Sequence, residues 1–182
     1  TVDNCYVYEC YDAGVTHQYD AGGTLNISMN NITYSNNVIE RCIYSIEYFN
    51  GKGNNDTVIR DGKNFRIVGN IMRLCGYGWG QQRPDKETPA HIKSWSHHTN
   101  RASNFLVANN VFDRSTHDLL NIAAASSESM PTLSANTYIQ HRGASAGAWG
   151  SEGVTYPFDD TVEESLKQIF DEQQAEIYFV EE

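Results

Sequence analysis

The stretch Asn70-Ile71-Met72-Arg73-Leu74-Cys75 places an asparagine directly before a short apolar strand, and this arrangement recurs along the 182-residue chain. Equivalent phrases begin at Asn4, Asn37, Asn110 and Asn136, so that successive asparagines are 33, 33, 40 and 26 residues apart. Repeats of this length are typical of solenoids, in which each repeat is one coil stacked on the next. The repeat therefore predicts the architecture of the chain.

Three short strands make up the best-defined repeats. One strand precedes the asparagine, as in Phe65–Val68, a second follows it, as in Ile71–Cys75, and a third comes later, as in Ser45–Phe49. Residues that favour bends, mainly Gly, Asn and Asp, lie between the coils. This pattern predicts an all-β fold, a right-handed parallel β-helix of about five coils that covers residues 1–150.

The recurring asparagine has two expected roles in such a coil. Asparagine tolerates the left-handed backbone conformation that a sharp bend between strands requires. Its side-chain amide can also bond to equivalent amides in coils about 4.8 Å above and below. Cys42 and Cys75 each follow an asparagine by five residues. We expect both to fill the core, because no CxxC pair suggests a metal site.

Two segments depart from the repeat. Residues 80–104 are expected to form an insertion on one face of the solenoid, where long insertions often line the binding surface. Residues 151–182 are expected to form a carboxy-terminal cap with an amphipathic helix at about 161–173. Thr161 and Glu164 have the spacing of a capping box. A partner-binding role for this helix is the alternative.

The charge of the chain is concentrated in its tail. The formal net charge is −10, and the segment from Asp159 to Glu182 contains nine acids and one base, Lys167. The rest is nearly neutral, which gives no basic footprint for nucleic acid. No apolar run is long enough for a membrane span, and the absence of a basic stretch followed by an apolar run means that we expect no signal peptide in this segment. The chain begins at Thr1 with the repeat already running, so we expect further coils to precede it in a longer parent protein.

The coil phrases Asn36-Asn37-Val38-Ile39-Glu40-Arg41-Cys42-Ile43-Tyr44 and Ala108-Asn109-Asn110-Val111-Phe112-Asp113-Arg114 resemble those of the pectate-lyase-like superfamily of right-handed parallel β-helix proteins. The resemblance covers residues 2 to 148 and is to the carboxy-terminal part of such proteins. It implies a secreted or cell-surface protein that acts on or binds carbohydrate, since the superfamily contains polysaccharide lyases, glycoside hydrolases and non-catalytic adhesins. The active-site phrases of its better-known members are absent, so no catalytic residue is transferred.

Coil register suggests where a site would lie. Cys10, Cys42, Cys75 and Ser115 occupy equivalent positions in four coils. The residues two positions after them are expected to form one exposed row about 14 Å long; they are Asp12, Tyr44, Tyr77 and His117. Tyrosine rings can pack against sugar rings, although Tyr44 and Tyr77 would equally stabilise the stack by themselves. Such a row would present a groove for two or three sugar units.

Two kinds of chemistry fit the neighbouring residues. Hydrolysis of a glycosidic bond needs two carboxyl groups, and Asp12 and Glu47 on adjacent coils are the predicted pair. β-Elimination needs a base and a cation that neutralises the substrate carboxylate, roles that His17, His117, Lys93 or Arg73 can fill. The sequence does not decide between them.

The resulting hypothesis is a segment of an extracellular polysaccharide hydrolase or lyase, with a non-catalytic glycan-binding or adhesive solenoid as the alternative. The predicted catalytic residues are Asp12, Glu47, His117 and Asp118. The predicted substrate-binding residues are His17, Tyr44, Tyr77, Trp79, Lys93 and Trp95. No metal or cofactor is predicted, because Asp20, Asp56 and Asp61 occur in turns without the spacing of a calcium loop.

Overall fold

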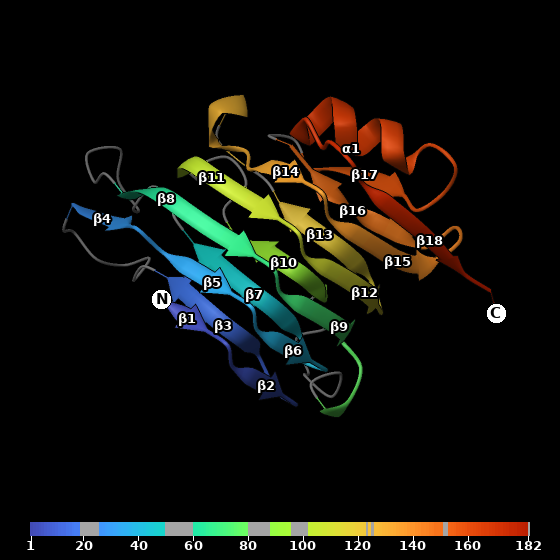
Figure 1. Ribbon diagram of the computed structural model, residues 1–182, viewed down its shortest axis with the longest axis horizontal. Helices are drawn as coiled ribbons and strands as arrows, with labels where there is room; N and C mark the ends of the chain where they lie inside the picture. The colour runs from blue at the N-terminus through green and yellow to red at the C-terminus, as the bar shows by residue number, and fades with distance from the viewer. Residues whose placement is uncertain are drawn as a thin grey trace.

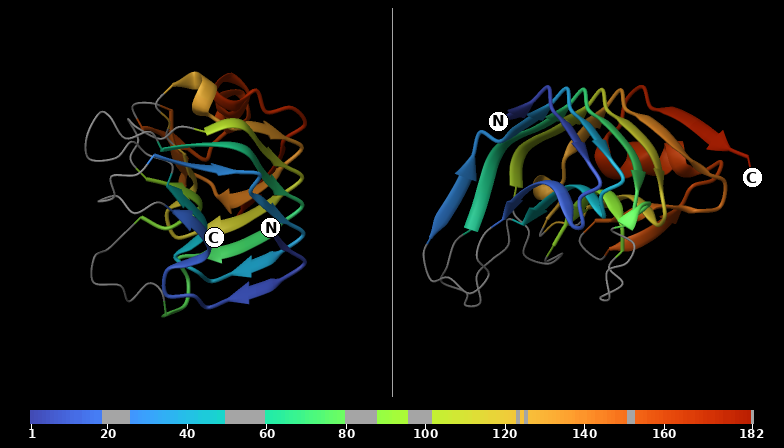
Figure 2. Two further views of the ribbon diagram at one scale, coloured as in Figure 1. Left: turned by 90° about the vertical axis from the view of Figure 1, so that its left-hand side faces the viewer. Right: turned by 90° about the horizontal axis from the view of Figure 1, so that it is seen from below.

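The computed structural model is a stack of coils whose strands form three parallel sheets (Figure 1). It describes residues 1–18, 26–49, 60–79, 88–95, 102–122, 124, 126–150 and 153–181. Seen from the side, consecutive coils lie one on another from the N-terminus to the C-terminus (Figure 2). The chain visits the three sheets in turn, so most coils contribute one strand to each sheet.

The strands are short, as the repeat predicts. Sheet A consists of β1 (Val2–Asp3), β5 (Thr33–Ser35), β8 (Arg60–Val68), β11 (Ala102–Ala108) and β14 (Thr132–Ser134), and β4 (Ile27–Asn30) also pairs with β8. Sheet B consists of β2 (Tyr6–Tyr8), β6 (Val38–Glu40), β9 (Ile71–Cys75), β12 (Val111–Ser115), β15 (Thr137–His141) and β18 (Glu176–Val180). Sheet C consists of β3 (Ala13–Gln18), β7 (Tyr44–Phe49), β10 (Ala90–Ser94), β13 (Asp118–Ile122), β16 (Ser145–Trp149) and β17 (Val154–Pro157). A short 3₁₀ helix, η2 (Ser127–Ser129), and one α-helix, α1 (Val162–Phe170), complete the elements.

The predicted β-solenoid is confirmed, with about six coils rather than five. The additional coil arises because β18 pairs in parallel with β15 and extends sheet B beyond the expected end of the repeat. The exception to parallel pairing is β17, which forms an antiparallel edge against β16.

A ladder of buried asparagines runs through the stack between sheets A and B. The Asn37 amide donates to Asn70 Oδ1 at 2.9 Å, and Asn70 donates to Asn110 Oδ1 at 3.0 Å. Asn110 continues the ladder by donating to Asn136 Oδ1 at 3.0 Å. Each of these acceptor oxygens also receives the backbone N–H of the asparagine that donates to it. The expected bonding along the stack is therefore confirmed.

The left-handed backbone conformation at the bend is taken by the residue before each ladder asparagine, not by the ladder asparagine itself. The residues that take positive φ at this bend are those immediately before the ladder: Asn36, Gly69, Asn109 and Ala135. Asn4 also has a positive φ, of 58°, and Cys5 occupies the ladder position, because Cys5 N donates to Asn37 Oδ1 at 2.9 Å. The alignment of Asn4 with Asn37 was thus wrong by one residue, since the bend uses two positions and asparagine suits both.

The tail closes the far end of the ladder. Glu172 is buried, and its carboxylate accepts the Asn136 amide and the Tyr138 hydroxyl at 2.9 and 2.8 Å. Burial raises the pKa of this carboxyl. Helix α1 turns Val162, Leu166 and Phe170 towards the core. The expected capping box does not form, because Thr161 bonds to Asp159 and Glu164 accepts from Gln168.

The expected insertion at residues 80–104 is largely part of the solenoid. Residues 90–94 form β10, which pairs with β7 and β13 in sheet C, and β11 begins at Ala102. Residues 80–87 and 96–101 lie outside the described part of the chain. The strand was missed because Ala90-His91-Ile92-Lys93-Ser94 carries three polar side chains and directly follows Pro89.

The interior contains histidines as well as apolar side chains. His91 is completely buried between Ser45, whose Oγ lies 3.0 Å from His91 Nδ1, and the ring of Phe112. His17 packs its ring edge-on against Phe65 and bonds to the Tyr34 hydroxyl at 2.9 Å. Burial lowers the pKa of each histidine to about 4, so both are neutral in the fold.

Replacing Asn70 with alanine is expected to destabilise the protein by about 3 kcal/mol, because two buried donors of Asn37 lose their acceptor. The measurement is the free energy of unfolding in urea. The control is Asn104→Gly, which removes the bond from exposed Asn104 to Asn64 and keeps a residue that accepts the φ of 50°. A loss no larger than that of the control would contradict a dominant role for the buried ladder.

His91→Gln is expected to reduce the loss of stability in acid. The pKa of His91 is lowered from 6.5 to about 4 by folding, so its stabilising effect is complete above pH 6.5 and declines as the pH falls towards 4. Between pH 7.5 and 5.0 the wild type should lose about 2 kcal/mol more than the variant. Urea unfolding at the two pH values measures this difference, and an equal loss in both proteins would refute it.

Candidate functional site

The outward face of sheet C carries a row of polar side chains in register. Thr16, Glu47, Lys93 and Asn121 are aligned on β3, β7, β10 and β13. The residues just before them, including Ile46, Ile92 and Leu120, belong to the apolar core. Because successive residues of a strand point to opposite faces, the polar row faces away from the core.

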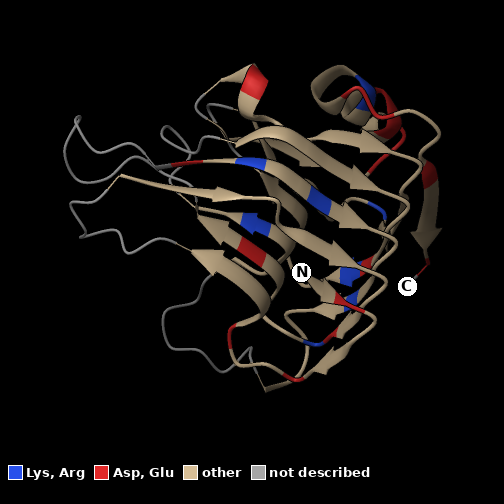
Figure 3. Cartoon of the chain, turned by 60° about the vertical axis from the view of Figure 1, so that its left-hand side comes forward, with Lys and Arg blue, Asp and Glu red and all other residues tan. Residues whose placement is uncertain are grey.

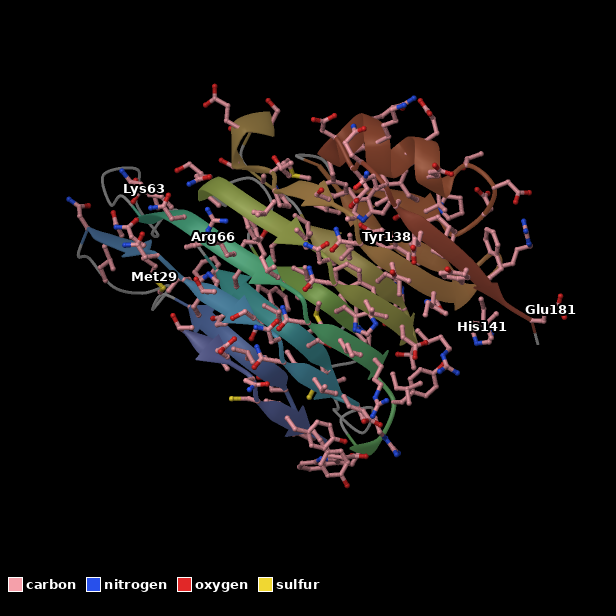
Figure 4. All side chains as sticks on the ribbon, viewed as in Figure 1. Met29, Lys63, Arg66, Tyr138, His141 and Glu181 are labelled. Atoms are coloured by element: carbon pink, nitrogen blue, oxygen red, sulfur yellow. The ribbon has the colours of Figure 1, made fainter. Side chains whose placement is uncertain are left out.

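Charged residues are few on this sheet, and they gather at this row. The strands of sheet C contain one Lys or Arg, Lys93, and two acids, Glu47 and Asp118. Lys93 and Glu47 are direct register partners on neighbouring strands. Figure 3 shows how sparsely Lys, Arg, Asp and Glu are distributed over the strands of the solenoid. Lys63 and Arg66, in contrast, lie on β8 of sheet A (Figure 4).

Glu47 is fixed by three side chains. Its carboxylate accepts bonds from Thr16 at 3.4 Å, from Gln18 and from the indole N–H of Trp95. The ammonium of Lys93 lies 4.7 Å from the centre of the Trp95 ring. Burial is the main cause that raises the pKa of Glu47, and the charge of Asp12 adds to it. The carboxyl of Glu47 therefore holds its proton more readily than that of an ordinary glutamate.

Asp118 forms a second cluster with His117. Asp118 Oδ1 lies 2.9 Å from His117 Nδ1 and accepts the Ser145 hydroxyl at 2.6 Å, while Oδ2 accepts the Asn121 amide at 2.7 Å. The carboxylate is almost inaccessible, whereas 54% of the His117 side chain is exposed. A carboxylate that holds Nδ1–H of a histidine leaves Nε2 as the basic atom. The accessible group of this cluster is thus an oriented imidazole.

Asn121 connects the two clusters. It is the register partner of Lys93 and donates to Asp118 three residues earlier on β13. One continuous face of β7, β10 and β13 therefore carries Glu47, Lys93 and, directly before β13, His117. We name the set Glu47, Lys93, Trp95, His117, Asp118 and Asn121 the sheet C cluster.

The expected exposed row is right at its ends and wrong in its middle. Asp12 and Pro89 accept backbone bonds from Ile43 and Asp118, so the column contains Asp12, Ile43, Pro89 and His117. Tyr44 lies one position further along its strand and is completely buried, with its ring edge-on to Trp95 at 5.9 Å. The coil corners differ in length, which simple counting from the cysteines could not reveal.

Other predicted site residues lie elsewhere. His17 points into the core against Phe65 and does not share the outward face. Tyr77 and Trp79 lie in the segment that follows β9, and Trp79 reaches back to Glu9 of the first coil. Asp12 is exposed at the start of β3, and its pairing with Glu47 in hydrolysis stays a prediction. Arg73 lies on sheet B, where it bonds to Glu40.

Three contributors were missed by sequence reasoning. Ser145, Asn121 and Gln18 position the two carboxylates, and none lies within a recognisable motif. The three-residue spacing of Asp118 and Asn121 was the available signal for their contact. It can be interpreted only when the register of β13 is known. Among the described residues, no group of three or more His, Cys, Asp or Glu side chains is arranged to hold a metal ion. Asp61 lies in sheet A, and Asp20 and Asp56 are outside the described residues.

Comparisons with protein-family models, with curated proteins and with solved structures gave no match to this chain. Within the described part of the chain, no helix has the length and apolar character that crossing a membrane requires. The sheet C cluster is thus the chemical feature of the described chain that points to a function.

The carboxyl of Glu47 is expected to titrate above 4.5, because it is buried and lies near Asp12. Carbon-13 NMR of glutamate-labelled protein would give its midpoint, and Glu47→Gln would assign the signal by removing it. A midpoint at or below 4.5 would show that the bonds from Trp95, Thr16 and Gln18 outweigh burial.

Proposed function

We propose that this chain is part of a carbohydrate-active protein of the pectate-lyase-like type that binds an acidic polysaccharide at the sheet C cluster and cleaves it by β-elimination. The observation that carries the proposal is the His117–Asp118 pair, in which a buried carboxylate orients a half-exposed imidazole. Lys93 is the one Lys or Arg on the strands of the sheet; it is itself 6% exposed, so it acts through the positive charge that it places beneath this face, where a uronate carboxylate would bind.

The chemistry follows from these roles. His117 Nε2 removes the proton beside the substrate carboxylate, and the electron pair left behind forms a carbon–carbon double bond as the bond to the glycosidic oxygen breaks. The departing oxygen takes a proton from the imidazolium or from water. Lys93 stabilises the negative charge that builds up on the carboxylate before the bond breaks. Glu47 keeps Trp95 and the neighbouring polar side chains in place.

Hydrolysis is less well supported, because it needs two available carboxyl groups, and of Asp12, Glu47 and Asp118 only Asp12 is exposed. Asp118 already accepts three hydrogen bonds and is 1% exposed. Glu47 accepts three bonds and is 5% exposed. A base other than carboxylate is available at His117, and this favours elimination.

The second candidate is a non-catalytic glycan-binding solenoid, and one observation favours it. Glu47, Lys93 and Asp118 have exposed fractions of 5%, 6% and 1%, so most of the charged cluster is covered. A ligand that approaches this face meets His117 first. Under either candidate, a secreted or cell-surface location and preceding coils in a longer parent chain belong to the proposal.

The test of elimination is the ultraviolet absorbance of unsaturated uronates, measured over a panel of acidic polysaccharides. His117→Ala and Lys93→Ala are each expected to reduce kcat/KM at least about 100-fold, because they remove the base and the cation. The matched control is His141→Ala, which removes a histidine of β15 on another sheet and should leave the rate unchanged.

Other results would redirect the proposal. Reducing sugar released without unsaturated product, and lost in Glu47→Gln, would show hydrolysis. Binding without release of either product would support the adhesive solenoid. Unchanged elimination in His117→Ala would reject His117 as the base.

A further inference from the structure

Trp79 is held against the corner of the first coil. The segment after β9 runs back towards β2 (Figure 1), and Trp79 Nε1 donates to the Glu9 carbonyl oxygen at 2.6 Å. The backbone N–H of Trp79 donates to Glu9 Oε2 at 3.4 Å, and Glu9 Oε1 pairs with Arg41 at 2.8 Å. Both ends of the Trp79 residue are thus fixed to one glutamate, which also ties the corner to the second coil.

A glycine makes this approach possible. Gly78 has a φ of 83°, and a Cβ at this position would lie 2.7 Å from Glu9 Oε2. Any larger residue would both strain the backbone and push the carboxylate away from the Trp79 N–H. The sequence Gly78-Trp79 therefore specifies where the indole sits.

The fixed indole leaves much of its surface in solvent. Trp79 is 49% exposed, and Tyr11, also exposed at 38%, lies with its ring centre 4.8 Å away at an angle of 40°. The buried Trp149, in contrast, stacks on Tyr156 within the cap and is 1% exposed. Tethering an exposed aromatic pair by hydrogen bonds is the arrangement of a preorganised contact surface.

The aromatic pair lies in line with the sheet C cluster. Tyr11 precedes Asp12, which shares a column with Ile43, Pro89 and His117. Three strand spacings separate the two ends of this column, which is about 14 Å and corresponds to two or three sugar units. A glycan that reaches His117 can therefore extend along the coil corners to the pair Trp79 and Tyr11.

We infer that Trp79 and Tyr11 form a stacking platform for a pyranose ring of the bound glycan, two or three units from the ring at His117. This inference rests on the proposed function and adds a subsite to it. The ring contact uses the apolar C–H face of the sugar, so it does not require a charged substituent on that unit.

The test measures the affinity of hexagalacturonate and of cellohexaose, a neutral hexasaccharide, by isothermal titration calorimetry. Trp79→Ala is expected to weaken hexagalacturonate binding about tenfold, with a smaller loss in Trp79→Phe, which keeps a flat ring. Gly78→Ala should weaken binding while the indole is still present. Tyr178→Ala removes an equally exposed ring of β18 at the opposite end of the stack and should have no effect.

The outcomes separate the platform from the proposed catalysis. If Trp79→Ala binds hexagalacturonate with wild-type affinity and loses only thermal stability, the platform is overturned. The proposed role of His117 is not affected by that result. His117→Ala should lose elimination, and Trp79→Ala added to it should bind about tenfold more weakly than His117→Ala alone. Failure of the wild type to bind either hexasaccharide overturns both inferences.

Discussion

The buried asparagine ladder sets the register on which all other features of this protein depend. The amide oxygens of Asn70, Asn110 and Asn136 each accept two donors from the preceding coil. The amide nitrogen of Asn70 donates both to Asn110 and to the Tyr34 carbonyl. A coil displaced by one residue would leave several buried polar groups without partners, which is costly in the interior. Glu172 ends the ladder by presenting a carboxylate where the next asparagine oxygen would stand.

A fixed register turns distant residues into neighbours. Glu47 and Lys93 are 46 positions apart in the chain and yet directly paired, because β7 and β10 occupy consecutive coils. The same stacking brings Ser145 to Asp118 and Trp79 to Glu9. The chemistry of the molecule is therefore built from single residues on successive coils, which explains why it contains no local catalytic motif.

The two ends of this face differ in character. Around His117 the groups are ionisable and mostly buried, which suits acid–base chemistry in a low-dielectric setting. Around Trp79 and Tyr11 the groups are aromatic and exposed, which suits contact with a sugar ring. Binding energy from such a remote contact can position a polymer for reaction elsewhere, a division of labour common in enzymes that act on chains.

The repeat, the apolar strands and the tail helix were readable from the sequence, because their causes are local: strand periodicity, bend residues and an amphipathic stripe. Asp118 and His117 were also identified as candidates, and the column that joins Asp12 to His117 was found at both ends. The burial of Tyr44, the inward position of His17 and the strand at Ala90–Ser94 were not foreseen. The first two depend on the number of residues at a coil corner, which sequence counting treats as constant, whereas the strand at Ala90–Ser94 was obscured by its polar side chains. The sequence by itself determined that the chain winds into stacked coils, whereas only the tertiary structure decided which side chains meet, because one residue more or fewer at a bend reverses the face to which a strand position points.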